Sequence, residues 1–190
     1  MVSGRAAIIL AAGASERMGS PKALLQWRGS TLVEHAIDQA RGAGVEQIVV
    51  VVGPATRHVE LNATTVLNPV PETGRSASIR LGAETIDGAP AAILVQSVDQ
   101  PVEAEVLTAL LQAVEDNAEV AVPSYRGRRG HPVCFAGQLL GELRQATEAE
   151  EGLRAVVRRH VVIEIPVESE SITWNLNDPA SYATARAKLE

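Results

Sequence analysis

The sequence predicts an α/β protein in which helices cover both faces of a mostly parallel sheet. Short apolar segments alternate along the chain with longer amphipathic segments of helical periodicity. The apolar segments are rich in Val, Ile and Ala, whereas aromatic residues make up only 3 % of the chain. Aliphatic runs of this kind are typical of strands that are buried on both faces and joined by helical crossovers. We therefore expect a single three-layer α/β/α domain with a Rossmann-like sheet over residues 1–190.

The expected strands are continuous apolar runs of strand length that are bounded by turn residues. In chain order they are 6–11, 47–53, 64–69, 91–99, 119–124, 132–136 and 161–167. Parallel sheets of this class bind ligands at the carboxyl ends of their strands. Residues 12–22, 68–78 and 97–101 each follow such a strand, so we expect these three segments to form the binding site.

The expected helices place their apolar residues on one face. A helix over 31–43 would bury Leu32, Val33, Ala36, Ile37 and Ala40, and a helix over 103–117 would bury Val106, Leu107, Leu110, Leu111 and Val114. A helix begins near Ser76 or Ser78 in the segment 74–86, a helical stretch runs to about Arg159, and 178–190 forms the last helix.

Composition excludes several classes of protein. The net charge is -6, which disfavours nucleic-acid binding, and no apolar run approaches the ~20 residues of a membrane span. Cys134 is the sole cysteine, so no internal disulfide is possible, and its apolar neighbours indicate a core residue rather than a nucleophile. No Cys/His cluster has the spacing of a zinc site. We expect a cytoplasmic protein that acts on a small molecule.

The segment LAAGASERMGSPK, residues 10–22, joins an apolar strand to a glycine-rich loop with two cations. Gly13 and Gly19 permit a positive φ and a close approach of the backbone, and free N–H groups in such a loop bind anions. Arg17 and Lys22 add full positive charges, so a polyphosphate is the favoured occupant and a plain surface turn the alternative. The spacing fits neither a P-loop nor the G-x-G-x-x-G fingerprint.

The segment LAAGASERMGSPKALL resembles the L-A-A-G-x-S-x-R-M-G-x-x-K signature of the MobA-like and sugar-nucleotide pyrophosphorylase nucleotidyltransferases. Further segments resemble family motifs in the same order: GRSASIRLGAE the nucleotide-base loop, SVDQP the metal-binding Asp-x-Pro, and NLNDPASY the late metal motif. RRGHPVCF and GLRAVVRRH resemble segments of the molybdenum cofactor cytidylyltransferase branch. Val98 departs from the family, which usually has Gly before this Asp.

The resemblance implies a role for individual residues. Arg17, Lys22 and Asp99 would be catalytic, and Mg²⁺ would bind Asp99 and Asn177, which we favour over Asn175. The nucleotide would contact the following set: Leu10, Ala11, Ala12, Gly13, Arg17, Lys22 and Ser78. Simpler structural roles stay open, since Asp99 could cap a helix, Asn177 could precede the last helix, and Ser78 could be a helix N-terminal serine.

The resemblance also implies a reaction. It would move CMP from CTP to a phosphorylated acceptor, most simply molybdopterin or its molybdenum-bearing form, and release pyrophosphate. Arg128, Arg129 and His131 would meet the acceptor, although a solvated loop and a turn explain them too. The alternatives are GTP with molybdopterin, transfer to a methylerythritol phosphate or a sugar phosphate, or a non-catalytic nucleotide-binding protein for cofactor insertion. A molybdoenzyme or chaperone partner is not specified by the sequence.

Overall fold

The main sheet contains eight of the strands in the described part of the chain, which comprises residues 4–13, 15 and 18–189 of the computed structural model. These strands are β1 (Arg5–Ala11), β4 (Gln47–Val52), β5 (Thr64–Leu67), β6 (Ala92–Ser97), β7 (Val120–Tyr125), β8 (Arg128–Arg129), β9 (Val133–Ala136) and β10 (Val162–Pro166). Their order across the sheet is β10-β7-β9-β6-β1-β4-β5, and β8 pairs with β7.

The centre of the sheet is parallel. Strand β1 lies between β4 and β6, so that Ile8 is opposite Val49 on one side and Val95 on the other, and β5 continues the parallel arrangement beyond β4. Strand β9 is antiparallel to both β6 and β7, while β10 and β7 are again parallel. The expected mostly parallel α/β sheet is therefore confirmed, with β9 and the short β8 as its antiparallel members.

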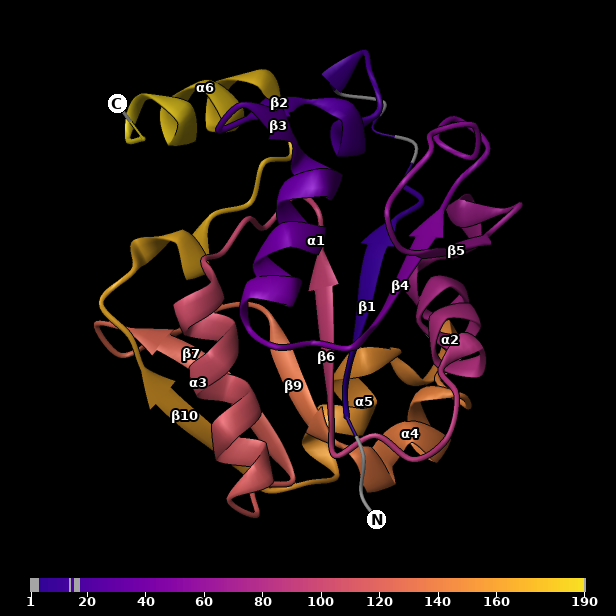
Figure 1. Ribbon diagram of the computed structural model, residues 1–190, viewed down its shortest axis with the longest axis vertical. Helices are drawn as coiled ribbons and strands as arrows, with labels where there is room; N and C mark the ends of the chain where they lie inside the picture. The colour runs from indigo at the N-terminus through magenta and orange to yellow at the C-terminus, as the bar shows by residue number, and fades with distance from the viewer. Residues whose placement is uncertain (1–3, 14, 16–17, 190) are drawn as a thin grey trace.

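Helices pack on both faces of this sheet, as the alternation of segments predicts (Figure 1). Helices α1 (Leu32–Gly42), α3 (Ala104–Glu115) and α6 (Pro179–Ala187) contribute to one apolar core with Ala7 and Ile9 of β1. Helices α2 (Arg75–Thr85), α4 (Leu140–Leu143) and α5 (Leu153–Arg158) contribute to the other with Ile8. Successive residues of β1 thus serve opposite faces, which is the period-two geometry of a strand.

Gly82 allows α2 to lie unusually close to the centre of the sheet. A Cβ atom on Gly82 would stand 2.4 Å from the Cγ2 atom of Ile8 and 3.2 Å from that of Val51. Neither strand has room to move, because Ile8 and Val51 are fully buried. The close packing fixes α2 against β1 and β4, and the candidate site lies at the N-terminal end of this helix.

The expected faces of α1 and α3 are confirmed, since all ten apolar residues predicted to point inward are buried. The stretch expected to be helical up to Arg159 is wrong as one unit: η4 (Gly137–Leu139), α4, η5 (Glu148–Glu150) and α5 are separate short pieces. The hairpin of β2 (Gln26–Trp27) and β3 (Ser30–Thr31) was not predicted, nor were η2 (Lys22–Leu24), η3 (Pro71–Thr73) and η6 (Glu170–Thr173). Among the helices in the described residues, none combines the length and hydropathy needed to cross a membrane.

Candidate functional site

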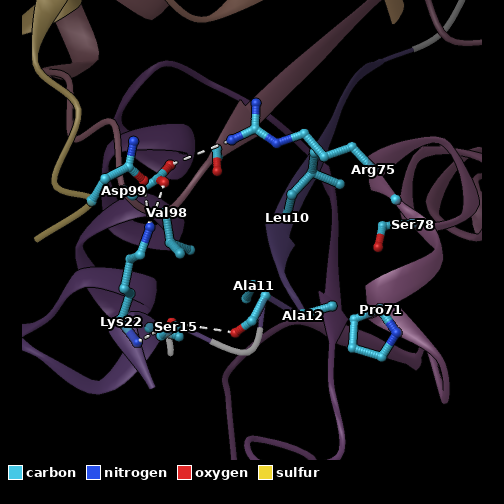
Figure 2. A pocket seen from close by; sticks show the side chains of 15 residues that line it. Leu10, Ala11, Ala12, Ser15, Lys22, Pro71, Arg75, Ser78, Val98 and Asp99 are labelled. Atoms are coloured by element: carbon cyan, nitrogen blue, oxygen red, sulfur yellow. Dashed lines mark hydrogen bonds and ion pairs between the residues drawn. The ribbon is translucent and has the colours of Figure 1, made fainter. Parts of the chain in front are cut away.

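A pocket of about 240 Å³ lies at the carboxyl ends of β1 and β6. Its wall contains residues of all three segments that follow apolar strands, which are 12–22, 68–78 and 97–101. The lining residues are Leu10, Ala11, Ala12, Gly13, Ser15, Lys22, Ala23, Pro71, Gly74, Arg75, Ser78, Ser97, Val98, Asp99 and Asn177. Figure 2 shows Lys22 and Asp99 on one side of this space and Ser78 and Pro71 on the other.

The loop after β1 is held in shape by Ser15. The Ser15 hydroxyl accepts a hydrogen bond from the backbone N–H of Lys22 at 2.9 Å, and the Ser15 carbonyl accepts one from the N–H of Met18. Gly19 takes a positive φ of 67°, as expected. Gly13 is not among the positive-φ glycines of the described residues, but a Cβ atom there would meet nothing within 4 Å, so this part of the wall is open. Arg17 lies outside the described residues.

Lys22 joins two segments that are far apart in the sequence. Its ammonium Nζ donates to Oδ2 of Asp99 at 3.0 Å and to Oδ1 of Asn177 at 2.5 Å. The side chains of Lys22 and Asp99 are 17 % and 7 % exposed, so water screens this ion pair only weakly. In the protein alone, the ammonium group therefore stands between the two oxygen atoms that sequence analysis assigned to a metal ion.

Asp99 is buried but ionised. Burial is the largest influence and opposes its charge, yet the neighbouring Ser97 hydroxyl and the Lys22 ammonium outweigh it and hold the pKa of Asp99 below its usual value. Only one carboxylate oxygen is well paired, because Oδ1 is buried and has no hydrogen bond of ordinary geometry with the described residues. Such an atom retains a lone pair for a cation that enters the pocket.

Arg75 is a site residue that sequence reasoning missed. It is the first residue of α2, and its guanidinium lies 3.9 Å from Oδ1 of Asp99 (Figure 2). The side chain is 62 % exposed and can move toward a ligand. The signal that points to Arg75 is a cation at the start of a helix that follows a strand end; in that segment, only Ser78 is predicted from the sequence as a site residue. Ser15 and Ser97 are the other polar lining residues that were missed.

None of the three proposed acceptor residues is among the residues that line the pocket. Arg128 and Arg129 form β8 at the side of β7, and Arg129 donates to Glu164 of β10 at 2.7 Å. His131 is nearer, since the charges of Arg75 and Asp99 both act on it; loss of hydration, aided by Arg75, lowers the pKa of His131. The acceptor roles of all three residues stay predictions.

Other titratable side chains belong to the core. Cys134 is fully buried, and burial raises the pKa of its thiol, which agrees with the expected structural role. His35 is 4 % exposed beside Trp27, and burial, followed by the charge of Arg28, lowers the pKa of His35 to about 4. These groups are not available for proton transfer in the pocket.

The model of the "MobA-like NTP transferase domain" family matches residues 7–164. The chain is 32 % identical over 165 residues to the bifunctional protein GlmU of Caulobacter vibrioides, and 36 % identical over 129 residues to a probable molybdenum cofactor guanylyltransferase of Bacillus cereus. These matches cover 80 % and 65 % of this chain, but only 36 % and 64 % of the respective relatives. The chain thus spans about a third of the first relative and somewhat under two thirds of the second.

Two further proteins are similar over most of their length. The nicotine blue oxidoreductase of Paenarthrobacter nicotinovorans is 30 % identical over 166 residues, which cover 80 % of either chain. The crystal structure of Rv0371c from Mycobacterium tuberculosis H37Rv superposes with a TM-score of 0.84 at 27 % identity, and the match covers 97 % of this chain and 99 % of that one. The expected fold and the resemblance to the MobA-like proteins are both confirmed.

Proposed function

The chain belongs to the MobA-like NTP transferase family, and on that premise we propose that it transfers a nucleotidyl group from a nucleoside triphosphate to a phosphorylated acceptor. The observation that carries this proposal is the charge of the pocket. Its charged lining residues among those described are Lys22, Arg75 and Asp99. Two cations thus face one carboxylate in a chain whose net charge is -6, which supports an anionic ligand.

The triphosphate would lie against Lys22 and the backbone of the loop after β1, with the base toward Ser78. The acceptor phosphate attacks the α-phosphorus, the bond from that phosphorus to the bridging oxygen breaks, and pyrophosphate leaves with the bond electrons. Lys22 stabilises the charge that develops on the leaving group. A phosphate monoester is already largely ionised at neutral pH, so the reaction needs no dedicated general base. Positioning and charge neutralisation suffice for such a transfer.

The residues of the pocket fit a divalent cation that arrives with the nucleotide. Oδ1 of Asp99 is a buried oxygen without a hydrogen bond to the described residues, 3.9 Å from the Arg75 guanidinium, and Oδ1 of Asn177 would be a second oxygen ligand once Lys22 turned to the phosphates. The described residues contain no group of three His, Cys, Asp or Glu side chains that could hold a metal by themselves. We propose Mg²⁺, which prefers few carboxylates together with phosphate oxygens. When bound, the ion neutralises charge on the triphosphate.

CTP is the proposed nucleotide. Guanine presents N1–H and N2–H donors on its pairing edge, and a second carboxylate would be their natural partner. Asp99 is the one carboxylate among the described lining residues, and it already pairs with Lys22 and faces Arg75. Ser78 is the polar side chain on the opposite wall, and a hydroxyl suits the acceptor atoms of cytosine. The resemblance of RRGHPVCF to the cytidylyl branch also supports CTP.

The proposed acceptor is molybdopterin or its molybdenum-bearing form. The guanylyltransferase of Bacillus cereus acts on a molybdenum cofactor according to its name, which supports this acceptor class and makes GTP the competing nucleotide. Sugar phosphates and a methylerythritol phosphate are the competing acceptors, and a non-catalytic role in cofactor insertion is the competing function. We also propose that the protein is cytoplasmic.

A pyrophosphate-release assay tests the proposal. Each nucleoside triphosphate is incubated with the protein, Mg²⁺ and molybdopterin, and then with a sugar phosphate or a methylerythritol phosphate in place of molybdopterin. We expect release with CTP and molybdopterin, and none when the acceptor is omitted. Nucleotide binding without release for every acceptor would favour the non-catalytic role, and release with GTP faster than with CTP would reject the cytidylyl assignment.

A further inference from the structure

Asn68 is a buried polar residue to which sequence analysis gave no individual role. It follows β5 directly, is 1 % exposed, and is held by its backbone N–H, which donates to the carbonyl of Val52 at 2.8 Å. Its side chain bridges the end of β5 and helix α2. The amide contacts the backbone of Val70 on one side and the hydroxyl of Ser78 on the other. Asn68 therefore lies directly behind a lining residue of the pocket.

Chemistry fixes the orientation of the Asn68 amide. The atom that faces the N–H of Val70, at 3.1 Å, must be the carbonyl oxygen, because a backbone N–H can only donate. The NH₂ group must then face Ser78, and it donates to Oγ of Ser78 at 2.9 Å in a buried environment. A flipped amide would set two donors against each other at Val70, which costs more than either bond is worth.

This orientation leaves the hydroxyl proton of Ser78 available. Since Oγ of Ser78 accepts from Asn68, its single proton is not used in that contact, and no hydrogen bond within residues 4–13, 15 and 18–189 employs it as a donor. Ser78 lines the pocket opposite Lys22 and Asp99, on the wall formed by α2 and η3 (Figure 2). Its hydroxyl proton is therefore free to point at a ligand, so Ser78 can donate into the pocket, while its second lone pair can still accept there.

We infer that Asn68 is a specificity-determining residue, which favours a base with an acceptor atom at this position by keeping the Ser78 proton available to the ligand. The inference rests on the proposed function. Cytosine offers O2 and N3 as acceptors on its pairing edge, whereas guanine offers N1–H and N2–H donors beside O6. The Ser78 proton pairs with O2 or N3 of cytosine but is left without an acceptor where N1–H or N2–H of guanine faces it, so the arrangement favours CTP over GTP without any contact between Asn68 and the nucleotide.

Asn68→Asp turns the Ser78 proton away from the pocket with almost no change in the shape of residue 68. One carboxylate oxygen still accepts from the N–H of Val70, but the other now accepts the proton of Ser78, whose lone pairs then face the pocket. Calorimetry at pH 8 with Mg²⁺ measures the dissociation constants of CTP and GTP. We expect the preference for CTP over GTP to fall by a factor of about 10–100, the effect of leaving one buried polar group unpaired.

Three variants separate this role from a structural one. In a Ser78→Ala background, Asn68→Asp should leave the CTP:GTP ratio unchanged, because the group that it reorients is gone. Asn68→Ala frees the Ser78 hydroxyl to rotate and should reduce the ratio without reversing it, which keeps the test valid if Asn68→Asp does not fold. The matched control is Thr56→Val, which removes a buried side-chain bond to Gly53 after β4 and should leave the ratio unchanged.

The outcomes distinguish the inference from the function on which it rests. A ratio that falls in Asn68→Asp and does not change in the Ser78→Ala background supports the role of Asn68. Equal weakening of CTP and GTP in Asn68→Asp and Asn68→Ala overturns it and leaves the proposed function standing. A wild-type protein that binds neither nucleotide overturns the proposed function, and the inference with it.

Discussion

Replacing Lys22 with Met tests whether its ammonium group holds the place of a metal ion in the free protein. The variant keeps an unbranched apolar stem in place of the lysine chain but leaves the buried Asp99 carboxylate without its ion-pair partner. At a separation of 3.0 Å, the attraction is about 5 kcal/mol for an effective dielectric constant of ~20, before any cost of desolvation. Removal of one partner from a buried pair costs ~3–5 kcal/mol. Arg75 remains 3.9 Å from Asp99, so we expect a loss near the lower end, about 3 kcal/mol.

The assay is urea unfolding of wild type and Lys22→Met, each with and without Mg²⁺. Mg²⁺ should scarcely stabilise the wild type, because the ammonium already lies between the Asp99 and Asn177 oxygens. It should restore part of the lost stability in the variant, where that position is vacated and the carboxylate is uncompensated. Turnover should fall by ~10²–10³ in Lys22→Met even with Mg²⁺, because the contact with the leaving pyrophosphate is lost.

The control is Lys188→Met, which removes an ammonium that pairs with Glu170 at the surface, where the two side chains are 47 % and 41 % exposed. Such pairs contribute ~0–1 kcal/mol, so this variant should behave like the wild type. Wild-type stability in Lys22→Met, or equal stabilisation of both proteins by Mg²⁺ alone, would refute the reasoning.

The remaining predictions concern the metal, pH and packing. Asp99→Asn should abolish activity at ordinary Mg²⁺ because an amide cannot replace the charge, whereas Asn177→Asp should retain activity with a lower Mg²⁺ requirement; a Mg²⁺ titration of turnover decides, and a fully active Asp99→Asn protein would place the metal elsewhere. His35 has a folded-state pKa of about 4, so between pH ~6.5 and 4 only the unfolded state gains its proton, and stability falls as the pH falls through that window. Urea unfolding at pH 7 and 4.5 should show a difference that shrinks in His35→Gln, and an unchanged difference would contradict the assignment. Gly82→Ala should lower the melting temperature, because overpacking against Ile8 costs ~1–3 kcal/mol and exceeds the ~1 kcal/mol gained in helix propensity, while Gly141→Ala, whose Cβ meets nothing within 4 Å, should not.

The central fold could be predicted because its information is local. Burial can be predicted from residue type in continuous apolar runs such as 47–52. It can be predicted from the helical spacing of apolar residues in α1 and α3. Strands of two residues, such as β2 and β8, are too short to carry a period. The stretch before Arg159 contains helical residues, but the break between α4 and α5 depends on tertiary contacts, including the carboxylate of Glu148, which accepts from the backbone N–H of Ser76.

Individual residues of the candidate site could be predicted from the sequence, but the contacts between them could not. Lys22, Asp99 and Asn177 were each chosen from their own motifs, and the structure brings them within hydrogen-bond distance although 155 residues separate the first from the last. No local sequence pattern predicts that Lys22 pairs with Asp99 in the absence of nucleotide. The same holds for Arg75 and Asn68, whose importance depends on which side chains the fold sets beside them.

The fate of isotopic label in CTP tests nucleotidyl transfer most directly. CTP labelled in either the α- or the γ-phosphate is incubated with the protein, Mg²⁺ and molybdopterin, and the products are separated. We expect the α-label to pass to the acceptor and the γ-label to pyrophosphate, at a rate that Lys22→Met lowers by ~10²–10³. Transfer of the γ-label to the acceptor, or release of inorganic phosphate with no α-labelled product, would contradict it.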